Sequence, residues 1–213
     1  MTPGLLISFE GSEGCGKSTQ IQRLKARLDA AGRIVELRRE PGGTHIGERI
    51  RDLLQHDKEA HQMKPVTELL LFAASRAQLV REQIRPSLDA GNVVILDRFF
   101  DSTTVYQGYA RGLPLEHVHA INRIAVGDVI PHLTVVLDMD ASAARERIHR
   151  DGRELDRIES QPLEFFEKVR QGYLHLAVEQ PQRMVVLDAN QTPDVIEAQI
   201  WKLVEDRIDA LQS

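Results

Sequence analysis

A glycine-rich segment near the start of the chain carries the clearest chemical signal. The phosphate-loop pattern G-x-x-x-x-G-K-[ST] is matched by Gly11-Ser12-Glu13-Gly14-Cys15-Gly16-Lys17-Ser18-Thr19, which follows an apolar run and precedes a helical pattern. In that setting backbone N–H groups converge on phosphate oxygens, and the positive end of the following helix strengthens the attraction. Lys17 is then placed to reach the β- and γ-phosphates, and the Ser18 hydroxyl to ligate Mg²⁺. The segment predicts a site for a nucleoside triphosphate with magnesium.

An aspartate followed by an arginine forms the second signal. The apolar run 93–96 ends in Asp97-Arg98, and an acid at the carboxyl end of a buried parallel strand lies where such sheets bind ligands. We therefore expect Asp97 to assist in coordinating Mg²⁺. A transport ATPase would usually carry a second acid where Arg98 stands, and a GTPase would carry N-K-x-D and D-x-x-G motifs, which the sequence lacks. A fixed cation at Arg98 instead suits a kinase whose acceptor is itself a phosphate ester.

These residues need a scaffold, and the hydrophobic pattern indicates one in which strands and helices alternate. The predicted strands cover 5–9, 34–37, 93–96, 133–137 and 184–187, and the predicted helices cover 21–28, 46–54, 66–88, 115–126, 141–148, 163–177 and 193–211. This order predicts an α/β fold, a parallel sheet with helices on both faces. Two polar stretches, 39–44 and 145–159, break the rhythm and are candidate loops or lids. The second mixes both charge signs, which on composition alone is more typical of a solvated turn.

Length and composition narrow the class of protein. The chain has 213 residues, of which 42% are hydrophobic, and this is typical of a single globular domain. Its 27 Lys and Arg against 32 Asp and Glu give a net charge of −5, the wrong sign for coating nucleic acid. No apolar stretch is long enough to span a membrane, and the lone Cys15 can form no internal disulfide. We expect one domain over 1–213, cytoplasmic, with neither a membrane nor a nucleic-acid partner.

Four blocks of sequence together resemble those of the thymidylate kinases, over nearly the full length of the chain. They are the phosphate loop with the preceding Phe9-Glu10; Arg39-Glu40-Pro41-Gly42-Gly43-Thr44; Asp97-Arg98 followed by Ser102, Tyr106 and Gln107; and Glu154-Leu155-Asp156-Arg157-Ile158-Glu159. Adenylate kinases carry a different loop, G-x-P-G-x-G-K-G-T, and lack the second block. The resemblance implies a P-loop nucleoside monophosphate kinase-like three-layer α/β/α fold, with a five-stranded parallel sheet in the order 2-3-1-4-5 and a short lid. It also implies a homodimer in which ATP, with Mg²⁺, phosphorylates dTMP to dTDP for dTTP synthesis.

The resemblance further implies a set of dTMP-binding residues. Arg39 and Arg98 match the arginines that hold the dTMP phosphate, and two guanidinium forks suit a dianionic group. Glu13 matches a carboxylate that accepts a hydrogen bond from the sugar 3′-hydroxyl. The rest of the acceptor set consists of Pro41, Phe72, Arg76, Ser102, Tyr106 and Gln107.

Four members of this set have further roles at the base and sugar. Phe72 and Arg76 lie four residues apart and so share one helix face. On spacing alone an aromatic residue in a helix is more often part of the core, but in the resembled family the ring stacks on thymine and the arginine donates to a base carbonyl. Tyr106 would lie against C2′ and exclude a ribose hydroxyl, and Gln107 would lie near the base.

The resemblance also implies the source of a catalytic arginine. Phosphoryl transfer requires positive charge on the migrating group and exclusion of water, which an arginine-bearing lid over about 145–159 would provide. In the resembled family this arginine comes from the phosphate loop or from the lid, and Gly14 occupies the loop position here. The resemblance is therefore to the bacterial type, in which the lid supplies the catalytic arginine. Arg153 is the first candidate for this residue, followed by Arg150 and Arg147. Arg145 would stack on adenine.

Other functions stay open at this point. They are a kinase for another nucleoside monophosphate, a kinase for free deoxynucleosides, and a nucleotide-gated module without turnover. A nucleoside kinase would not need the pair Arg39 and Arg98. The intact Lys17, Ser18 and Asp97 count against the module, because a decayed enzyme usually loses one of them.

Overall fold

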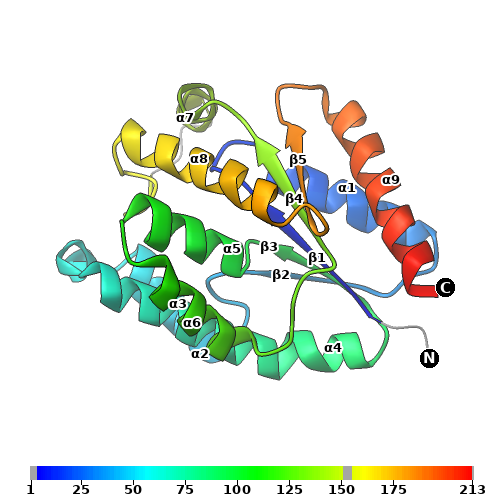
Figure 1. Ribbon diagram of the computed structural model, residues 1–213, viewed down its shortest axis with the longest axis horizontal. Helices are drawn as coiled ribbons and strands as arrows, with labels where there is room; N and C mark the ends of the chain where they lie inside the picture. The colour runs from blue at the N-terminus through cyan, green and yellow to red at the C-terminus, as the bar shows by residue number, and fades with distance from the viewer. Residues whose placement is uncertain (1–3, 151–154, 213) are drawn as a thin grey trace.

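A parallel five-stranded sheet forms the centre of the computed structural model, which describes residues 4–150 and 155–212 (Figure 1). The strand order is β2-β3-β1-β4-β5, as predicted. The strands are β1 (Leu5–Glu10), β2 (Val35–Arg39), β3 (Val93–Asp97), β4 (Leu133–Asp138) and β5 (Met184–Asp188). Each prediction was right to within one or two residues at either end. The largest difference is in β2, which continues to Arg39, so this arginine belongs to the sheet and not to the polar loop after it.

The side chains of β1 point alternately to the two faces of the sheet, and the core is divided into a layer on each face. Helices α1 (Lys17–Ala30) and α9 (Pro193–Gln212) lie on one face of the sheet (Figure 1). Successive side chains of a strand point to opposite faces, so Leu5 and Ile7 join the cluster beneath these helices and Leu6 joins a separate cluster on the other face. Burying each such side chain contributes roughly 1.5–3 kcal/mol. The strand that leads into the phosphate loop is therefore held from both sides.

The opposite face is covered by a long helical stretch, predicted as one helix over 66–88. It consists of α3 (Pro65–Leu79), η2 (Val80–Ile84) and α4 (Arg85–Asp89), in which η2 is a π-helical turn. Three smaller elements accompany it: α2 (His45–Gln55), η1 (Lys58–Gln62) and α6 (Leu115–Val126). Helices α2 and α6 both pack against α3. The N-terminus of α2 is closed by the Thr44 hydroxyl, which accepts a hydrogen bond from the Gly47 N–H at 2.9 Å.

The segment after β3 is also helical, which the sequence pattern did not predict. Helix α5 (Phe100–Thr103) continues into η3 (Thr104–Ala110), and η3 packs against α8 (Leu163–Glu179). The run of threonine, tyrosine and β-branched residues here favours strand by local propensity. Burial against α8 overrides that preference.

The predicted lid is described in two parts, residues 145–150 of helix α7 (Ala141–Arg150) and residues 155–159. The phosphate loop packs directly on α7: a Cβ added to Gly14, whose φ is +78°, would lie 2.5 Å from the Ala144 carbonyl oxygen. Only glycine fits such a contact and such a φ. The position of α7 is thus coupled to the backbone of the loop.

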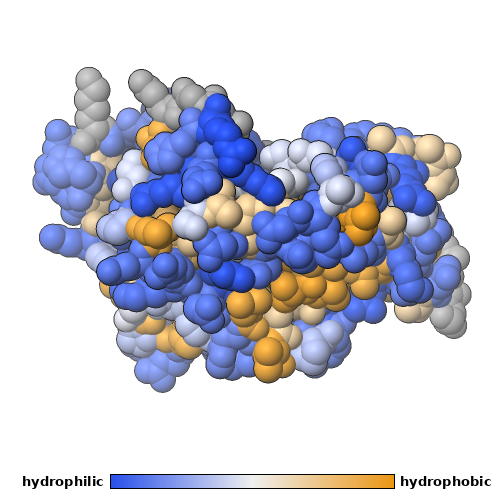
Figure 2. Space-filling view, turned by 90° about the horizontal axis from the view of Figure 1, so that it is seen from above, coloured by the Kyte–Doolittle hydropathy of each residue, from blue (hydrophilic) through white to orange (hydrophobic). Residues whose placement is uncertain are grey.

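The face of the molecule that is seen from above is mostly hydrophilic (Figure 2). In the view from above, apolar residues gather in a band across the lower half of the molecule (Figure 2). No helix within residues 4–150 and 155–212 combines the length and apolar character needed to cross a membrane.

Candidate active site

A cavity of about 670 Å³ opens at the carboxyl ends of β1, β2 and β3. This edge of a parallel sheet is where ligands bind in open α/β folds. All the predicted dTMP-binding residues and both predicted metal ligands line it: Glu13, Ser18, Arg39, Pro41, Phe72, Arg76, Asp97, Arg98, Ser102, Tyr106 and Gln107. The structure therefore brings together residues that lie as far apart in the sequence as the phosphate loop and η3.

Positive φ angles shape the phosphate loop. They are 128° at Gly11, 78° at Gly14 and 93° at Gly16, conformations that glycine adopts without steric cost. Lys17, the first residue of α1, is buried, and its ammonium group donates to the carbonyl oxygens of Gly11 at 3.2 Å and Ser12 at 2.9 Å. Lys17 thus lies folded on the loop itself and does not line the main cavity.

A second cavity, of about 20 Å³, lies between the loop and α7. Ser12 and Glu13 line it together with Arg145, which donates to the Gln161 carbonyl oxygen at 2.8 Å. Arg145 therefore lies beside the phosphate loop, and its contact with adenine stays a prediction. Cys15 is buried in the same loop, and burial raises the pKa of its thiol. A raised pKa leaves little thiolate, so we interpret Cys15 as a small residue that fits the loop and not as a reactive thiol.

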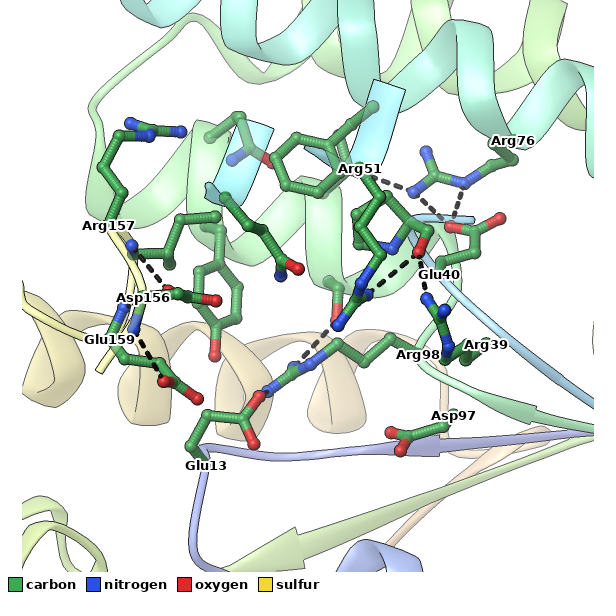
Figure 3. A pocket seen from close by; sticks show the side chains of 18 of the residues that line it. Glu13, Arg39, Glu40, Arg51, Arg76, Asp97, Arg98, Asp156, Arg157 and Glu159 are labelled. Atoms are coloured by element: carbon green, nitrogen blue, oxygen red, sulfur yellow. Dashed lines mark hydrogen bonds and ion pairs between the residues drawn. The ribbon is translucent and has the colours of Figure 1, made fainter. Parts of the chain in front are cut away.

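Arg98 lies directly after β3 with a φ of 69°, a region that non-glycine residues rarely occupy outside functional sites. Its Nη2 lies 2.6 Å from a Glu13 oxygen, and its Nη1 donates to the hydroxyls of Ser102 at 3.1 Å and Tyr173 at 3.2 Å. Figure 3 shows the side chain reaching toward Glu13. Burial alone would lower the Arg98 pKa, but Tyr106 and Glu13 raise it well above its usual value. The guanidinium is thus a fixed cation.

Two more arginines share one carbonyl oxygen beside the cavity. Arg39 Nη1 and Arg51 Nη1 donate to the Pro41 oxygen at 2.9 and 3.0 Å, and Arg39 Nη2 lies 2.8 Å from Glu48. Burial and repulsion from Arg39 lower the pKa of Arg51. Arg51, on α2, was missed by the sequence argument. The available signal was its position one turn after Glu48, on the first helix beyond the second block.

Arg76 lies in the wall of the cavity but is only 1% exposed. Its Nη2 and Nε lie 2.6 and 2.8 Å from a Glu40 oxygen, and it also donates to Asn122 at 3.0 Å and Thr103 at 2.8 Å. These contacts fix the plane of the guanidinium. Burial raises the pKa of Glu40 to about 7, although Arg76 lowers it. The second Glu40 oxygen is buried without a hydrogen-bond partner among the described residues, which adds to the cost of its charge.

The residues of η3 face the same cavity. The Arg98 guanidinium lies 5.1 Å from the centre of the Tyr106 ring, a favourable cation–π distance. Gln107 donates its Nε2 to the buried Glu68 at 3.0 Å. Phe72, on α3, is half-buried and also lines this cavity.

The lid arginines are placed unequally. Arg150 is exposed and lies 3.7 Å from Glu146, while Arg147 lies 3.5 Å from the Ala189 carbonyl oxygen. Neither lines the main cavity. Arg153, the first choice for catalysis, lies outside the described residues.

A different arginine of the fourth block does line the cavity. Arg157 donates its Nε to the Leu54 carbonyl oxygen at 2.9 Å, and its Nη2 lies 2.6 Å from Glu68. Asp156 and Glu159 lie beside it (Figure 3), and burial raises the Asp156 pKa. The sequence argument used this block for recognition only. The three charged residues Asp156, Arg157 and Glu159 fall within four positions, and this pattern could have indicated that the block lines the site.

The sheet order, with a glycine loop joining β1 to α1, is that of the P-loop kinases. An arginine-rich cavity beside the loop adds room for a second, phosphorylated substrate, so the fold and the site together define a kinase of the nucleoside monophosphate class. Comparison with known proteins narrows the class.

A family model for thymidylate kinase matches residues 9–200. The thymidylate kinase of Deinococcus radiodurans is 47% identical over 207 residues, which is 97% of this chain and 99% of the relative. That of Syntrophotalea carbinolica is 50% identical over 200 residues, 92% of either chain. The crystal structure of thymidylate kinase from Ehrlichia chaffeensis superposes with a TM-score of 0.76 at 32% identity, covering 95% of this chain and 99% of the other. The chain belongs to the thymidylate kinase family.

Proposed function

We propose that this protein transfers the γ-phosphoryl group of ATP to dTMP, giving dTDP and ADP. The observation that carries the proposal is the single cavity in which phosphate-binding arginines, an aromatic ring and polar groups suited to a base meet beside the phosphate loop. A dTMP phosphate oxygen forms the new bond to the γ-phosphorus, and the bond from that phosphorus to the β–γ bridging oxygen breaks. Because the acceptor is already an anionic nucleophile, catalysis consists of positioning and charge stabilisation.

The acceptor phosphate binds between Arg98 and Arg39, with Arg51 as a third donor. All three line one part of the cavity, and Arg39 and Arg51 already converge on the Pro41 carbonyl oxygen. A Glu13 carboxylate oxygen forms an ion pair with Arg98 Nη2 at 2.6 Å. In this proposal Glu13 moves from Arg98 to the sugar 3′-hydroxyl when the dTMP phosphate takes its place.

The base and sugar occupy the rest of the cavity. Phe72 stacks on thymine, and Arg76 donates to a base carbonyl. The orientation of the Arg76 guanidinium is fixed by Glu40, whose carboxylate oxygen lies 2.6 Å from Arg76 Nη2. Tyr106, whose ring is held by Arg98, lies against C2′ and disfavours ribose. Gln107 and Ser102 complete the acceptor side.

The ATP phosphates bind the loop from Gly11 to Thr19, and Mg²⁺ accompanies them. The residues fit such an ion: Ser18 and Asp97 both line the cavity and offer the oxygen ligands that Mg²⁺ prefers. No group of three or more His, Cys, Asp or Glu residues in the described part of the chain could hold a metal ion. Bound there, the ion neutralises charge on the β- and γ-phosphates.

The positive charge on the transferred group comes from Lys17 and a lid arginine. Arg153 is the first candidate for the latter, because Arg150 and Arg147 point elsewhere in this structure. Arg145, beside the phosphate loop, meets the adenine.

We also propose a single-domain, cytoplasmic homodimer. Helices α2, α3 and α6 pack side by side and leave large apolar side chains exposed. They include Ile46, Leu53, Val66, Leu70 and Ile124. A surface of this kind is typical of an interface between subunits, and sedimentation equilibrium of the purified protein measures whether it forms a dimer.

The activity is tested by ADP formation from ATP and Mg²⁺ with dTMP, dUMP, dCMP, AMP, UMP and thymidine in parallel. A strong preference for dTMP is expected, and Lys17→Met serves as the inactive control. Turnover of thymidine without turnover of dTMP would contradict the acceptor-phosphate site. ATP binding with no acceptor-dependent turnover would contradict the kinase itself.

A further inference from the structure

Glu10 is a buried acid that the proposed reaction leaves unused. It ends β1, it is 0% exposed, and it does not line the main cavity. One carboxylate oxygen accepts hydrogen bonds from the Phe99 N–H at 2.8 Å and the Ser8 hydroxyl at 3.1 Å. The other accepts from the hydroxyls of Ser102 at 2.6 Å and Tyr173 at 2.8 Å. Such a complete set of donors offsets the cost of burying a charge.

The two hydroxyls connect Glu10 to Arg98. Both Ser102 and Tyr173 accept a hydrogen bond from Arg98 Nη1, at 3.1 and 3.2 Å. Arginine can only donate, an ionised carboxylate can only accept, and each hydroxyl has one hydrogen. Each hydroxyl hydrogen therefore points either to Glu10 or to the oxygen of the other hydroxyl, 2.8 Å away, and at least one of the two points to Glu10. Glu10 is the terminal acceptor and leaves lone pairs of both hydroxyls facing Arg98.

Glu10 also holds the backbone at Arg98. The Phe99 N–H that binds Glu10 belongs to the residue directly after Arg98, and the Arg98 N–H donates to the Phe9 carbonyl oxygen at 3.0 Å. These two bonds enclose the residue with the φ of 69°. A left-handed arginine persists only where its surroundings over-determine it. The end of β1 therefore restrains Arg98 at its backbone and at its guanidinium.

We infer that Glu10 is a positioning residue for the acceptor phosphate, holding Arg98 in the orientation that receives it. The inference rests on the proposed binding of the dTMP phosphate by Arg98. Glu10 itself touches no substrate.

Replacing Glu10 with glutamine tests the orientation of the Ser102 and Tyr173 hydroxyls, because the side chain at position 10 keeps nearly the same shape. The Phe99 N–H requires an oxygen, so the amide nitrogen faces the hydroxyls of Ser102 and Tyr173 and donates to them. One hydroxyl can still donate to the other, so at least one of the two hydrogens turns toward Arg98, which can only donate. The substitution reverses the polarity of the network, and Arg98 must move.

The experiment is titration calorimetry of dTMP and thymidine with the wild-type protein and Glu10→Gln. Loss of a hydrogen bond to a charged group corresponds to about tenfold or more in affinity, so dTMP should bind about tenfold more weakly. Thymidine has no phosphate, and its affinity should change less than about twofold. Glu82→Gln, an exposed residue of η2, is the matched control.

Tyr173→Phe provides a second variant in case Glu10→Gln does not fold. It removes one acceptor from Arg98 while Ser102 remains, so dTMP should bind about threefold more weakly with thymidine unchanged. Tyr109→Phe, in a half-exposed ring of η3, is its control. Equal weakening of both ligands, or unchanged dTMP binding in either variant, would overturn the inference. Wild-type protein that binds dTMP no tighter than thymidine would instead overturn the role of Arg98, and with it the proposed acceptor site.

Discussion

Removing Arg76 should destabilise the protein strongly, and most at high pH. In Arg76→Met the Glu40 carboxyl, 6% exposed, loses the guanidinium that lies 2.6 Å away. Breaking a buried ion pair by removing one partner costs about 3–5 kcal/mol, out of a total stability of about 5–15 kcal/mol. In a chain of this size each kcal/mol lowers the melting temperature by about 2–4 °C. The expected fall is about 6–20 °C at alkaline pH.

The sign of the pH dependence follows from Glu40. Burial raises its pKa to about 7, and loss of Arg76 raises it further because no opposite charge then favours the ionised form. A carboxyl whose pKa is higher in the folded than in the unfolded chain contributes stability at low pH and loses it as the pH rises through the folded pKa. The deficit of Arg76→Met relative to wild type should therefore shrink as the pH falls from about 8 to about 6.

Thermal and urea unfolding, followed by circular dichroism at both pH values, measures this deficit. The double variant Glu40→Gln/Arg76→Met has nothing to titrate at position 40, so its deficit relative to the single variant Glu40→Gln should not change with pH. Lys25→Met, which removes an exposed ion pair with Asp29 on α1, should cost no more than about 1 kcal/mol. The reasoning is wrong if Arg76→Met costs less than that control, or if its deficit is the same at both pH values.

Three further predictions concern the reaction. Arg153→Ala should lower turnover by on the order of 10³ to 10⁵ while dTMP affinity is kept; unchanged turnover in single-turnover kinetics would refute the lid assignment. Asp97→Asn should raise the Mg²⁺ concentration needed for half-maximal rate, and an unchanged magnesium titration would remove Asp97 from the metal site. Gly14→Ala should weaken ATP binding because its Cβ would meet the Ala144 carbonyl oxygen at 2.5 Å. Gly32→Ala has a similar φ of +75° but nothing within 4 Å, so ATP titration should show no effect there.

The sheet could be predicted because its strands are short, apolar and separated by helical periods. That pattern is local, and every strand was found within one or two residues. The helical segment after β3 could not be predicted in this way. Its residues have no clear helical period, and its structure depends on packing against α8, more than 50 positions further along the chain.

The proposed acceptor site was predictable to the extent that its residues lie in recognisable blocks. Arg98 was singled out because a fixed cation after Asp97 suits a phosphate acceptor, Arg39 was identified through the resemblance of its block, and both line the cavity. Glu10 and Tyr173 could not be found, because a role that depends on a 2.8 Å contact between residues 163 positions apart has no local pattern. Arg51 was missed for a different reason: its partner is the Pro41 carbonyl oxygen, and its spacing from Glu48 does not point to a backbone partner.

The contact between the phosphate loop and α7 also limits how this enzyme could evolve. A single change of Gly14 to arginine would supply a loop arginine in sequence, yet its Cβ would collide with the Ala144 carbonyl oxygen before the guanidinium could reach a phosphate. Helix α7 would have to move first, and that movement would disturb the lid in which we place the catalytic arginine. A loop arginine in this chain would therefore require a change in α7 as well as the substitution at Gly14.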